Sequence, residues 1–215
     1  METRAIEFIS RKDRAVVMRA MEGHFVTQHS HVTHCIDLTQ VKSQISSAKG
    51  AAKLFAESFR NSPVDTIITL ERTKMVGAFL AEELAAFGIN VNKDIAVISP
   101  EITGDKMILR DNFIPYVRGR HVLLLTATAT TGMTLMSALE GIRYYGGEPA
   151  GAATVFGGNF GTNLRLQDGR IIPVTRLFNA EDIRGYRSYA ATNCPLCGAG
   201  KKVDALINSY GYSKI

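Results

Sequence analysis

The sequence lacks tryptophan and has three cysteines, Cys35, Cys194 and Cys197, among its 215 residues. This odd number, together with the absence of an apolar signal segment in residues 1–7, argues against a disulfide framework and predicts a cytoplasmic location. No apolar run approaches the roughly 20 residues that a membrane-spanning helix needs, so no membrane association is expected. There is no block of like charge either, and nothing in the sequence supports a nucleic-acid-binding module.

What is present is the composition of an ordinary soluble globular protein. Apolar residues make up 46% of the chain and charged residues 21%. The length is sufficient for one large α/β domain with its own hydrophobic core. The formal net charge of +5 suits an anionic small ligand or a nucleic acid, and by itself it does not distinguish between the two.

We expect one main domain over residues 1–190 and a C-terminal tail over residues 191–215 packed on it. A first helix is expected over 3–22, ended by Gly23, and an extended segment over 25–37. From residue 64 onward, strands and helices alternate, which predicts a parallel sheet covered on both faces by helices. The later helices are expected at 46–59, 75–87 and 135–145, and the strands at 64–70, 95–99, 122–125, 149–156 and 171–178.

A long polar segment, residues 100–119, separates two of the predicted strands. Connections of this length in compact domains are more often functional lids or disordered segments than simple links. Because it directly precedes the strand described next, we expect it to act as a lid over a ligand site.

The most informative stretch is a buried strand at 122–125 that runs into a turn rich in threonine, and then into a helix. Backbone N–H groups and hydroxyls at the start of a helix bind phosphate well, and glycine allows a close approach of the backbone. The alternative is a strand-to-helix connection that merely happens to be rich in threonine. Neither the Gly-Lys-Ser/Thr of a P-loop nor the Gly-x-Gly-x-x-Gly of a dinucleotide site is present. The stretch therefore predicts a phosphorylated small-molecule ligand.

This stretch resembles the phosphoribosyl pyrophosphate (PRPP) motif of type I phosphoribosyltransferases, in which apolar residues and two acidic residues precede a small-Thr-Thr-Gly-x-Thr turn. The resemblance implies an α/β fold with a doubly wound parallel sheet and a small irregular hood, here followed by a Cys-x-x-Cys tail. It also implies a homodimer and Mg²⁺ bound together with PRPP. The residues that it assigns to the PRPP phosphate are Thr126, Thr128, Ala129, Thr130, Thr131, Gly132, Met133 and Thr134.

Other segments are similar to the orotate branch of that family. The turn at 71–74 matches the pyrophosphate-binding loop in position; the alternative is a solvated polar turn. Residues 25–37 resemble the early substrate loop, and residues 100–119 match the flexible lid, with the basic residues Lys106 and Arg110 as candidate catalytic residues of the lid. The candidate pyrophosphate-binding residues are Glu71, Arg72, Thr73 and Lys74.

The chain departs from the motif at the acidic pair, which falls on Thr126 and Ala127. Thr126 can still hydrogen-bond a ribose hydroxyl, but Ala127 offers no polar group. Two functions therefore stay open. One is an orotate phosphoribosyltransferase-like enzyme that transfers phosphoribosyl to a pyrimidine base. The other is a catalytically impaired regulatory or binding protein that senses PRPP or a nucleotide. A homologue with an altogether different ligand is a third reading.

The tail contains Cys194-Pro-Leu-Cys197, which supplies two of the four ligands of a structural zinc site. The missing two could be Cys35 with His34 or His31, or could come from a second chain. The alternative is a pair of reduced thiols in a turn. His29, His31 and His34 alternate along the extended segment 25–37, and surface or substrate-loop roles are open for them.

Overall fold

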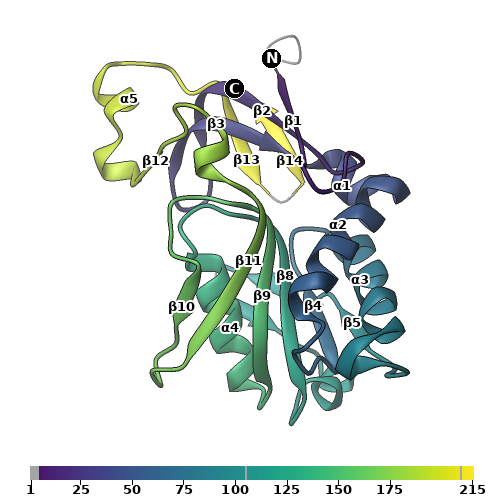
Figure 1. Ribbon diagram of the computed structural model, residues 1–215. Helices are drawn as coiled ribbons and strands as arrows, with labels where there is room; N and C mark the ends of the chain where they lie inside the picture. Colours follow the sequence, from purple (N-terminus) through teal and green to yellow (C-terminus); the bar gives the residue numbers. More distant parts are fainter. Residues whose placement is uncertain (1–4, 105, 209) are drawn as a thin grey trace.

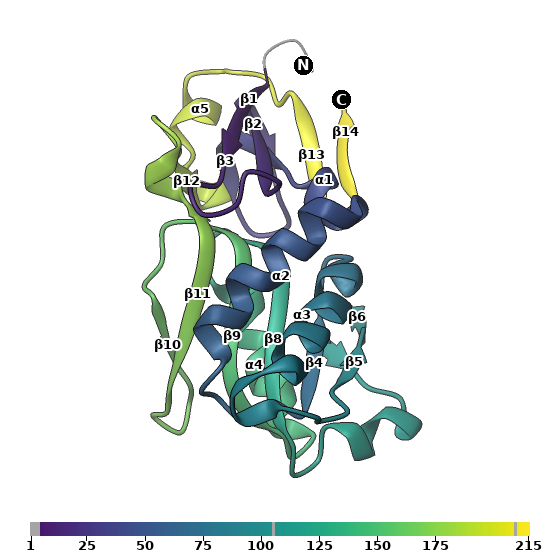
Figure 2. The same ribbon diagram turned by 45° about the vertical axis from the view of Figure 1, so that its right-hand side comes forward.

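The computed structural model describes residues 5–104, 106–208 and 210–215. Two six-stranded sheets make up most of the fold. We call them the core sheet and the hood. Figures 1 and 2 show the hood lying over one end of the core sheet, with the long helix α2 (Ile45–Phe59) beside the core sheet and reaching up to the hood.

The core sheet has the strand order β10-β11-β9-β8-β4-β5, and all its neighbours are parallel except the edge strand β10, which is antiparallel to β11. The parallel sheet expected from the alternating pattern is therefore confirmed. Its strands are β4 (Thr66–Thr69), β5 (Ala96–Ile98), β8 (His121–Ala129), β9 (Glu148–Gly157), β10 (Asn163–Arg165) and β11 (Ile171–Asn179).

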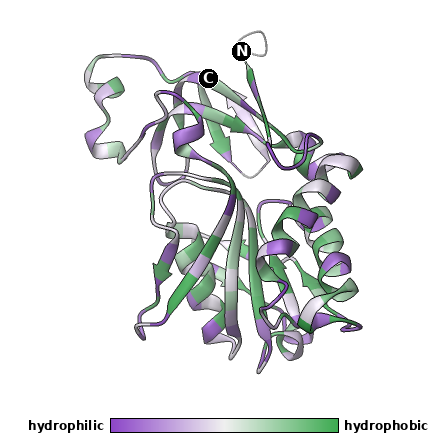
Figure 3. Cartoon of the chain, in the orientation of Figure 1, coloured by the Kyte–Doolittle hydropathy of each residue, from purple (hydrophilic) through white to green (hydrophobic). Residues whose placement is uncertain are grey.

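Helices cover both faces of this sheet, as a doubly wound fold requires. Along β8, Leu123 and Leu125 belong to the same hydrophobic cluster as residues of α2 and α3 (Lys74–Ala86). Val122 and Leu124 belong to the opposite cluster with residues of α4 (Met133–Tyr144). Successive strand residues point to opposite faces, so a continuous apolar run is what a strand buried on both sides needs. Figure 3 shows hydrophobic residues along these strands. In the described part of the chain, no helix is long and apolar enough to cross a membrane.

The hood is a regular sheet, where an irregular one was expected. It has the order β12-β3-β2-β13-β14, with β1 paired to β2. Its strands are β1 (Ile6–Ile9), β2 (Val17–Val26), β3 (His31–Asp37), β12 (Ser188–Tyr189), β13 (Ala205–Asn208) and β14 (Gly211–Lys214). The two C-terminal strands thus complete a sheet that begins near the N-terminus, and the short helices α1 (Thr39–Ser43) and α5 (Pro195–Gly198) flank it.

The helix predicted over 3–22 is wrong for the described residues; residues 3 and 4 lie outside them. β1 and β2 form an antiparallel pair there instead. Met18 and Ala20 are buried, while Val17 and Arg19 between them are half-buried, which is the period-2 pattern of a strand. The apolar residues fit either period over so short a run, and pairing with β3 decided the outcome.

Gly23, expected to end that helix, lies inside β2. The register of β2 against β3 shifts between Glu22 and Phe25, as at a β-bulge. A Cβ atom at Gly23 would lie 2.6 Å from Asp204 Oδ2. The glycine therefore marks a bulge and a close approach of the tail, a reading that glycine inside a strand also allows.

The expected lid segment has more structure than its sequence suggests. It contains a β-hairpin of β6 (Glu101–Thr103) and β7 (Lys106–Ile108), followed by a 3₁₀ helix at Asp111–Tyr116. Further 3₁₀ turns in the described residues lie at Gly88–Asn90, Ala180–Asp182 and Ala191–Asn193.

Candidate active site

A cleft of about 230 Å³ opens between the hood and the carboxyl ends of the core strands. Parallel α/β sheets bind ligands at this edge. Three segments meet there: residues 27–30 between β2 and β3, Leu70 and Glu71 after β4, and residues 128–134 at the end of β8 and the start of α4. Segments far apart in the sequence, each assigned to ligand binding, thus line one cavity.

The phosphate loop, residues 130–134, follows β8 and begins α4. Gly132 is the N-cap of α4 with φ +81°, a left-handed conformation that glycine adopts without strain. Gly132 has no side chain with which to cap the helix, and Thr131 Oγ1 is a distant 3.5 Å from the Met133 nitrogen. The N–H groups at a helix start carry partial positive charge. This helix end is accordingly suited to bind an anion.

The segment after β9, together with Arg176 and Tyr186, supports the phosphate loop. Gly158 N–H donates to the Ala129 carbonyl at 2.7 Å, and a Cβ atom on Gly158 would lie 2.2 Å from the Thr130 carbonyl oxygen. The Arg176 guanidinium donates to the Phe160 carbonyl at 2.6 Å. Burial raises the pKa of Tyr186 to about 12, although its hydrogen bond with Thr130 acts in the opposite direction. Tyr186 therefore stays a neutral phenol beside the loop.

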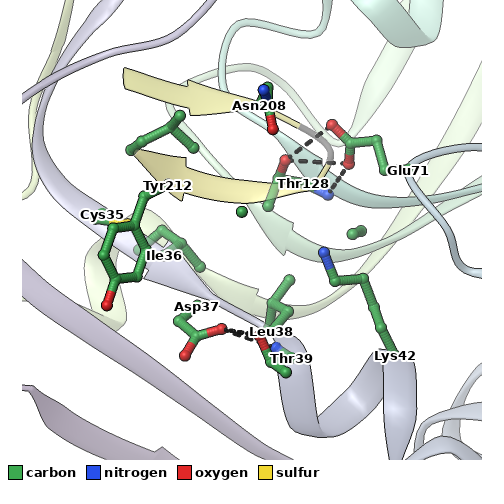
Figure 4. Close-up of a pocket in the computed structure, with 13 residues that line it drawn as sticks. Cys35, Ile36, Asp37, Leu38, Thr39, Lys42, Glu71, Thr128, Asn208 and Tyr212 are labelled. Carbon is green, nitrogen blue, oxygen red and sulfur yellow. Dashed lines mark hydrogen bonds between the residues drawn. The ribbon is translucent and has the colours of Figure 1, made fainter. Parts of the chain in front are cut away.

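Glu71 does not belong to a solvated turn, because its carboxylate is bound to β8. It accepts a hydrogen bond from Thr126 Oγ1 at 2.8 Å. It also accepts hydrogen bonds from the Thr128 N–H at 2.7 Å and from Thr128 Oγ1 at 3.1 Å, both of which Figure 4 shows. Glu71 and Arg72 have φ of +50° and +64°, which for non-glycine residues costs about 1–3 kcal/mol each. The strained backbone of Glu71 and Arg72 thus places the Glu71 carboxylate next to Thr126, which is one of the two positions where the acidic pair of the motif is missing.

A second, smaller cavity of about 40 Å³ also borders Glu71 and Thr128 (Figure 4). Asp37 and Lys42 come to it from the end of β3 and from α1, and the Lys42 amino group points toward Glu71 and Thr128. Burial lowers the pKa of Lys42, while the charges of Glu71 and Asp37 act in the opposite direction. Sequence reasoning missed Lys42, since no motif surrounds it.

The other residues of the predicted pyrophosphate loop differ in their exposure. Thr73 is fully buried and its Oγ1 donates to the Leu70 carbonyl at 2.7 Å, so this hydroxyl serves the turn itself. Arg72 and Lys74 are exposed, and the Arg72 guanidinium lies 5.3 Å from the ring centre of Tyr210. Neither of these two side chains is among the residues that line the cleft, so their binding of pyrophosphate stays a prediction.

The two basic residues proposed for the lid lie on or next to the β6–β7 hairpin. Lys106 and Arg110 are exposed, and Arg110 forms an ion pair with Glu101 at 2.8 Å. Neither is among the residues that line the cleft, whereas Ile102 of the same hairpin is. A catalytic role for Lys106 and Arg110 stays a prediction.

The thiols of the tail lie beside two hood histidines. The ligand atoms of His24, His31, Cys194 and Cys197 all lie within 4.8 Å of one another. Of the partners considered from the sequence, His31 belongs to this group. Burial, helped by the charge of Asp37, raises the pKa of Cys35 to about 12, so Cys35 stays a thiol. His24 was not singled out, because nothing near it in the sequence marks a metal site.

Comparison with known proteins gave a consistent result, although no family model matches the chain. The chain is 26% identical to an orotate phosphoribosyltransferase of Sulfurimonas denitrificans over 187 residues, covering 85% of this chain and 89% of that protein. It is 24% identical to one of Desulforamulus reducens over 182 residues, covering 84% and 85%.

Solved structures share the fold. A phosphoribosyltransferase of Corynebacterium diphtheriae aligns with a TM-score of 0.51 at 20% identity, covering 76% of this chain and 89% of that one. Orotate phosphoribosyltransferase of Mycobacterium tuberculosis, solved with Fe(III) dicitrate, aligns with a TM-score of 0.51 at 17% identity, covering 76% and 90%. An adenine phosphoribosyltransferase of Trypanosoma brucei, solved with AMP, pyrophosphate and ribose-5-phosphate, aligns with a TM-score of 0.52 at 16% identity, covering 76% and 78%. The chain is thus similar in sequence to orotate phosphoribosyltransferases and shares the fold of type I phosphoribosyltransferases.

Proposed function

We propose that this phosphoribosyltransferase-like protein binds PRPP and transfers its phosphoribosyl group to a pyrimidine base such as orotate. The observation that carries the proposal is the phosphate loop at the start of α4, which faces the hood loop 27–30 across one cleft. A ligand with a phosphate at one end and a base at the other matches such a cleft. The orotate phosphoribosyltransferases similar to this chain over most of its length support the same assignment.

In this proposal each loop binds one part of the substrates. The N–H groups and hydroxyls of residues 130–134 bind the 5-phosphate. The exposed cations Arg72 and Lys74 pair with pyrophosphate oxygens. The base lies against the hood, where Gln28 and His29 line the cleft and can hydrogen-bond its ring edge.

Glu71 takes over the part of the missing acidic pair. Transfer breaks the bond between the anomeric carbon and pyrophosphate oxygen, and forms a bond between that carbon and a nitrogen of the base. Positive charge develops on the ribose in between, and a nearby carboxylate stabilises it. In the described part of the chain, Glu71 is the carboxylate that lines both the cleft and the smaller cavity beside it.

Mg²⁺ is expected to enter together with PRPP. Carboxylate and phosphate oxygens are the ligands that Mg²⁺ prefers, and Glu71 and Asp37 both border the smaller cavity, so the donor set fits. When bound, the ion would neutralise charge on the pyrophosphate.

A second candidate function is a regulatory or binding protein that senses PRPP or a nucleotide without turnover. It is favoured by one observation, that the position of the second acid is occupied by Ala127, whose side chain is buried and apolar. In that case the cleft binds the ligand, and the arrangement at Thr126 and Glu71 serves only to shape the loop.

One experiment separates the two. The pure protein is incubated with PRPP, Mg²⁺ and orotate, and orotidine monophosphate and pyrophosphate are quantified while calorimetry measures PRPP binding. Formation of orotidine monophosphate and pyrophosphate in equal amounts is the expected result. PRPP binding without turnover on any pyrimidine would contradict the enzyme hypothesis and support the sensor hypothesis. Absence of PRPP binding would overturn both hypotheses.

A variant of the phosphate loop tests the site itself. Thr131→Val removes a hydroxyl from the cleft and is expected to weaken PRPP binding about tenfold, as loss of one hydrogen bond to a charged group does. Thr175→Val on β11, which does not line the cleft, is the matched control and should bind PRPP normally.

We also propose that the protein forms a homodimer, and light scattering after size-exclusion chromatography would measure its molar mass.

A further inference from the structure

His24, His31, Cys194 and Cys197 are a cluster that the proposed transfer reaction does not use. His24 comes from β2, His31 begins β3, and the two cysteines flank the start of α5 in the tail. We propose that these four residues bind a structural Zn²⁺ that ties the tail to the hood, next to the loop that lines the cleft.

The distances match tetrahedral coordination. His24 Nε2 lies 3.1 Å from His31 Nδ1, and the Cys194 and Cys197 sulfurs lie 3.7 and 3.6 Å from His24 Nε2. The Cys197 sulfur lies 3.3 Å from His31 Nδ1. Around zinc with its usual bond lengths, two nitrogens lie about 3.3 Å apart and a nitrogen and a sulfur about 3.6 Å apart. One ion at the centre of the cluster can therefore contact all four atoms.

Hydrogen bonds alone do not satisfy this cluster. His24 Nδ1 lies 2.8 Å from the Lys201 carbonyl, which can only accept, so Nδ1 carries the proton and Nε2 presents its lone pair. Three groups, from His31, Cys194 and Cys197, converge on that single lone pair. A histidine that binds zinc through one nitrogen commonly donates its other N–H to a carbonyl, which is the arrangement of His24.

The site also explains how the tail is held. In residues 190–204, all of which the structure describes, Cys194 is the one buried residue. A segment with so little buried apolar surface cannot be ordered by a core of its own. A metal joining positions 24 and 31 to 194 and 197 closes a long loop of the chain, where such a link removes the most entropy from the unfolded state.

A zinc site here bears on the cleft. His31 directly follows residues 27–30, which line the cleft facing the phosphate loop. Fixing His24 and His31 together holds both ends of that loop. The site needs no PRPP, so its test is independent of the proposed function.

Metal content is the first measurement. Protein purified without chelator is analysed by mass spectrometry of the elements, and one zinc per chain is expected. Apo-protein titrated with Co²⁺ should then develop the visible absorption of tetrahedral cobalt with thiolate ligands. If the purified protein holds no zinc and the apo-protein takes up neither Zn²⁺ nor Co²⁺ from an excess, the proposal is overturned.

Variants assign the ligands. Cys197→Ser changes an exposed ligand and should lower the zinc affinity more than roughly 100-fold, beyond the effect of losing an outer hydrogen-bond partner. His34→Gln, on the same strand as His31 but outside the cluster, is the control and should retain one zinc per chain. Should Cys197→Ser fail to fold, chelator titration of the unmodified protein must still lower its melting temperature together with the loss of zinc. Wild-type zinc content in Cys197→Ser would exclude this ligand set.

Discussion

At the scale of single residues, Glu71 places a carboxylate next to Thr126, where the motif of the family has an acidic residue. Thr126 is fully buried, and its hydroxyl donates to the Glu71 carboxylate. A negative charge at this place therefore comes from the neighbouring loop, not from β8. Ala127 is buried in the same cluster as α2 and α3, where a carboxylate would lose its hydration.

This arrangement predicts how restoring the acid will behave. Thr126→Asp alone should destabilise the protein by about 2–3 kcal/mol, because it buries a second carboxylate against Glu71. Combining it with Glu71→Thr exchanges acid and hydroxyl, and should recover most of the loss. Urea unfolding of the two variants and of Glu71→Thr measures the coupling. Additive effects of the two substitutions would show that the two side chains do not interact.

At the scale of secondary-structure elements, Asp65 links three segments at the amino ends of the core strands. Its carboxylate accepts hydrogen bonds from Lys93 Nζ at 2.8 Å, from the His121 N–H at 2.9 Å and from His121 Nδ1 at 2.8 Å. Burial by itself would raise the pKa of Asp65, but the bonds from Lys93 and His121 outweigh it and hold that pKa well below its usual 3.8.

The sign of the pH dependence follows. The folded state favours ionised Asp65, so its stabilisation is complete above about pH 3.8 and is lost as the pH falls from there toward the lowered pKa. Asp65→Asn should cost about 1 kcal/mol at pH 7, and the difference from wild type should shrink in acid. Urea unfolding between pH 7 and pH 2 tests this, with the exposed neighbour Asp94→Asn as control. A difference that stays constant down to pH 2 would contradict it.

At the scale of the whole molecule, the cleft exists because two sheets meet. The hood supplies residues 27–30 and the end of β13, while the core sheet supplies the phosphate loop and Glu71. A ligand that contacts both the hood and the core sheet should reduce local opening of the backbone in both.

Hydrogen exchange with saturating PRPP and Mg²⁺ should therefore slow amide exchange in residues 27–30 as well as in 130–134. Inorganic phosphate, which can fill only the phosphate loop, is the control and should protect 130–134 alone. Protection by PRPP that is confined to 130–134 would place the rest of the ligand away from the hood.

The sequence was most informative where the pattern was strongly periodic and least where strands pair across long distances. Five of the six core strands and α2, α3 and α4 could be predicted from apolar runs and helical periodicity, whereas the short edge strand β10 was not. β1 and β2 were taken for a helix, since their short apolar runs suit both periods. β13 and β14 were missed, because β13 joins the hood by pairing with β2, which lies near the N-terminus.

The amino-acid sequence by itself predicted five strands of the core sheet, its helices and the threonine-rich turn after β8, because each is a run of residues that are close together in the chain. Tertiary structure alone decided that Glu71 stands beside Thr126, and that His24 and His31 meet Cys194 and Cys197. Those contacts join segments more than 50 residues apart. No local spacing encodes them, and they arise only when strand order and the hood bring the segments together.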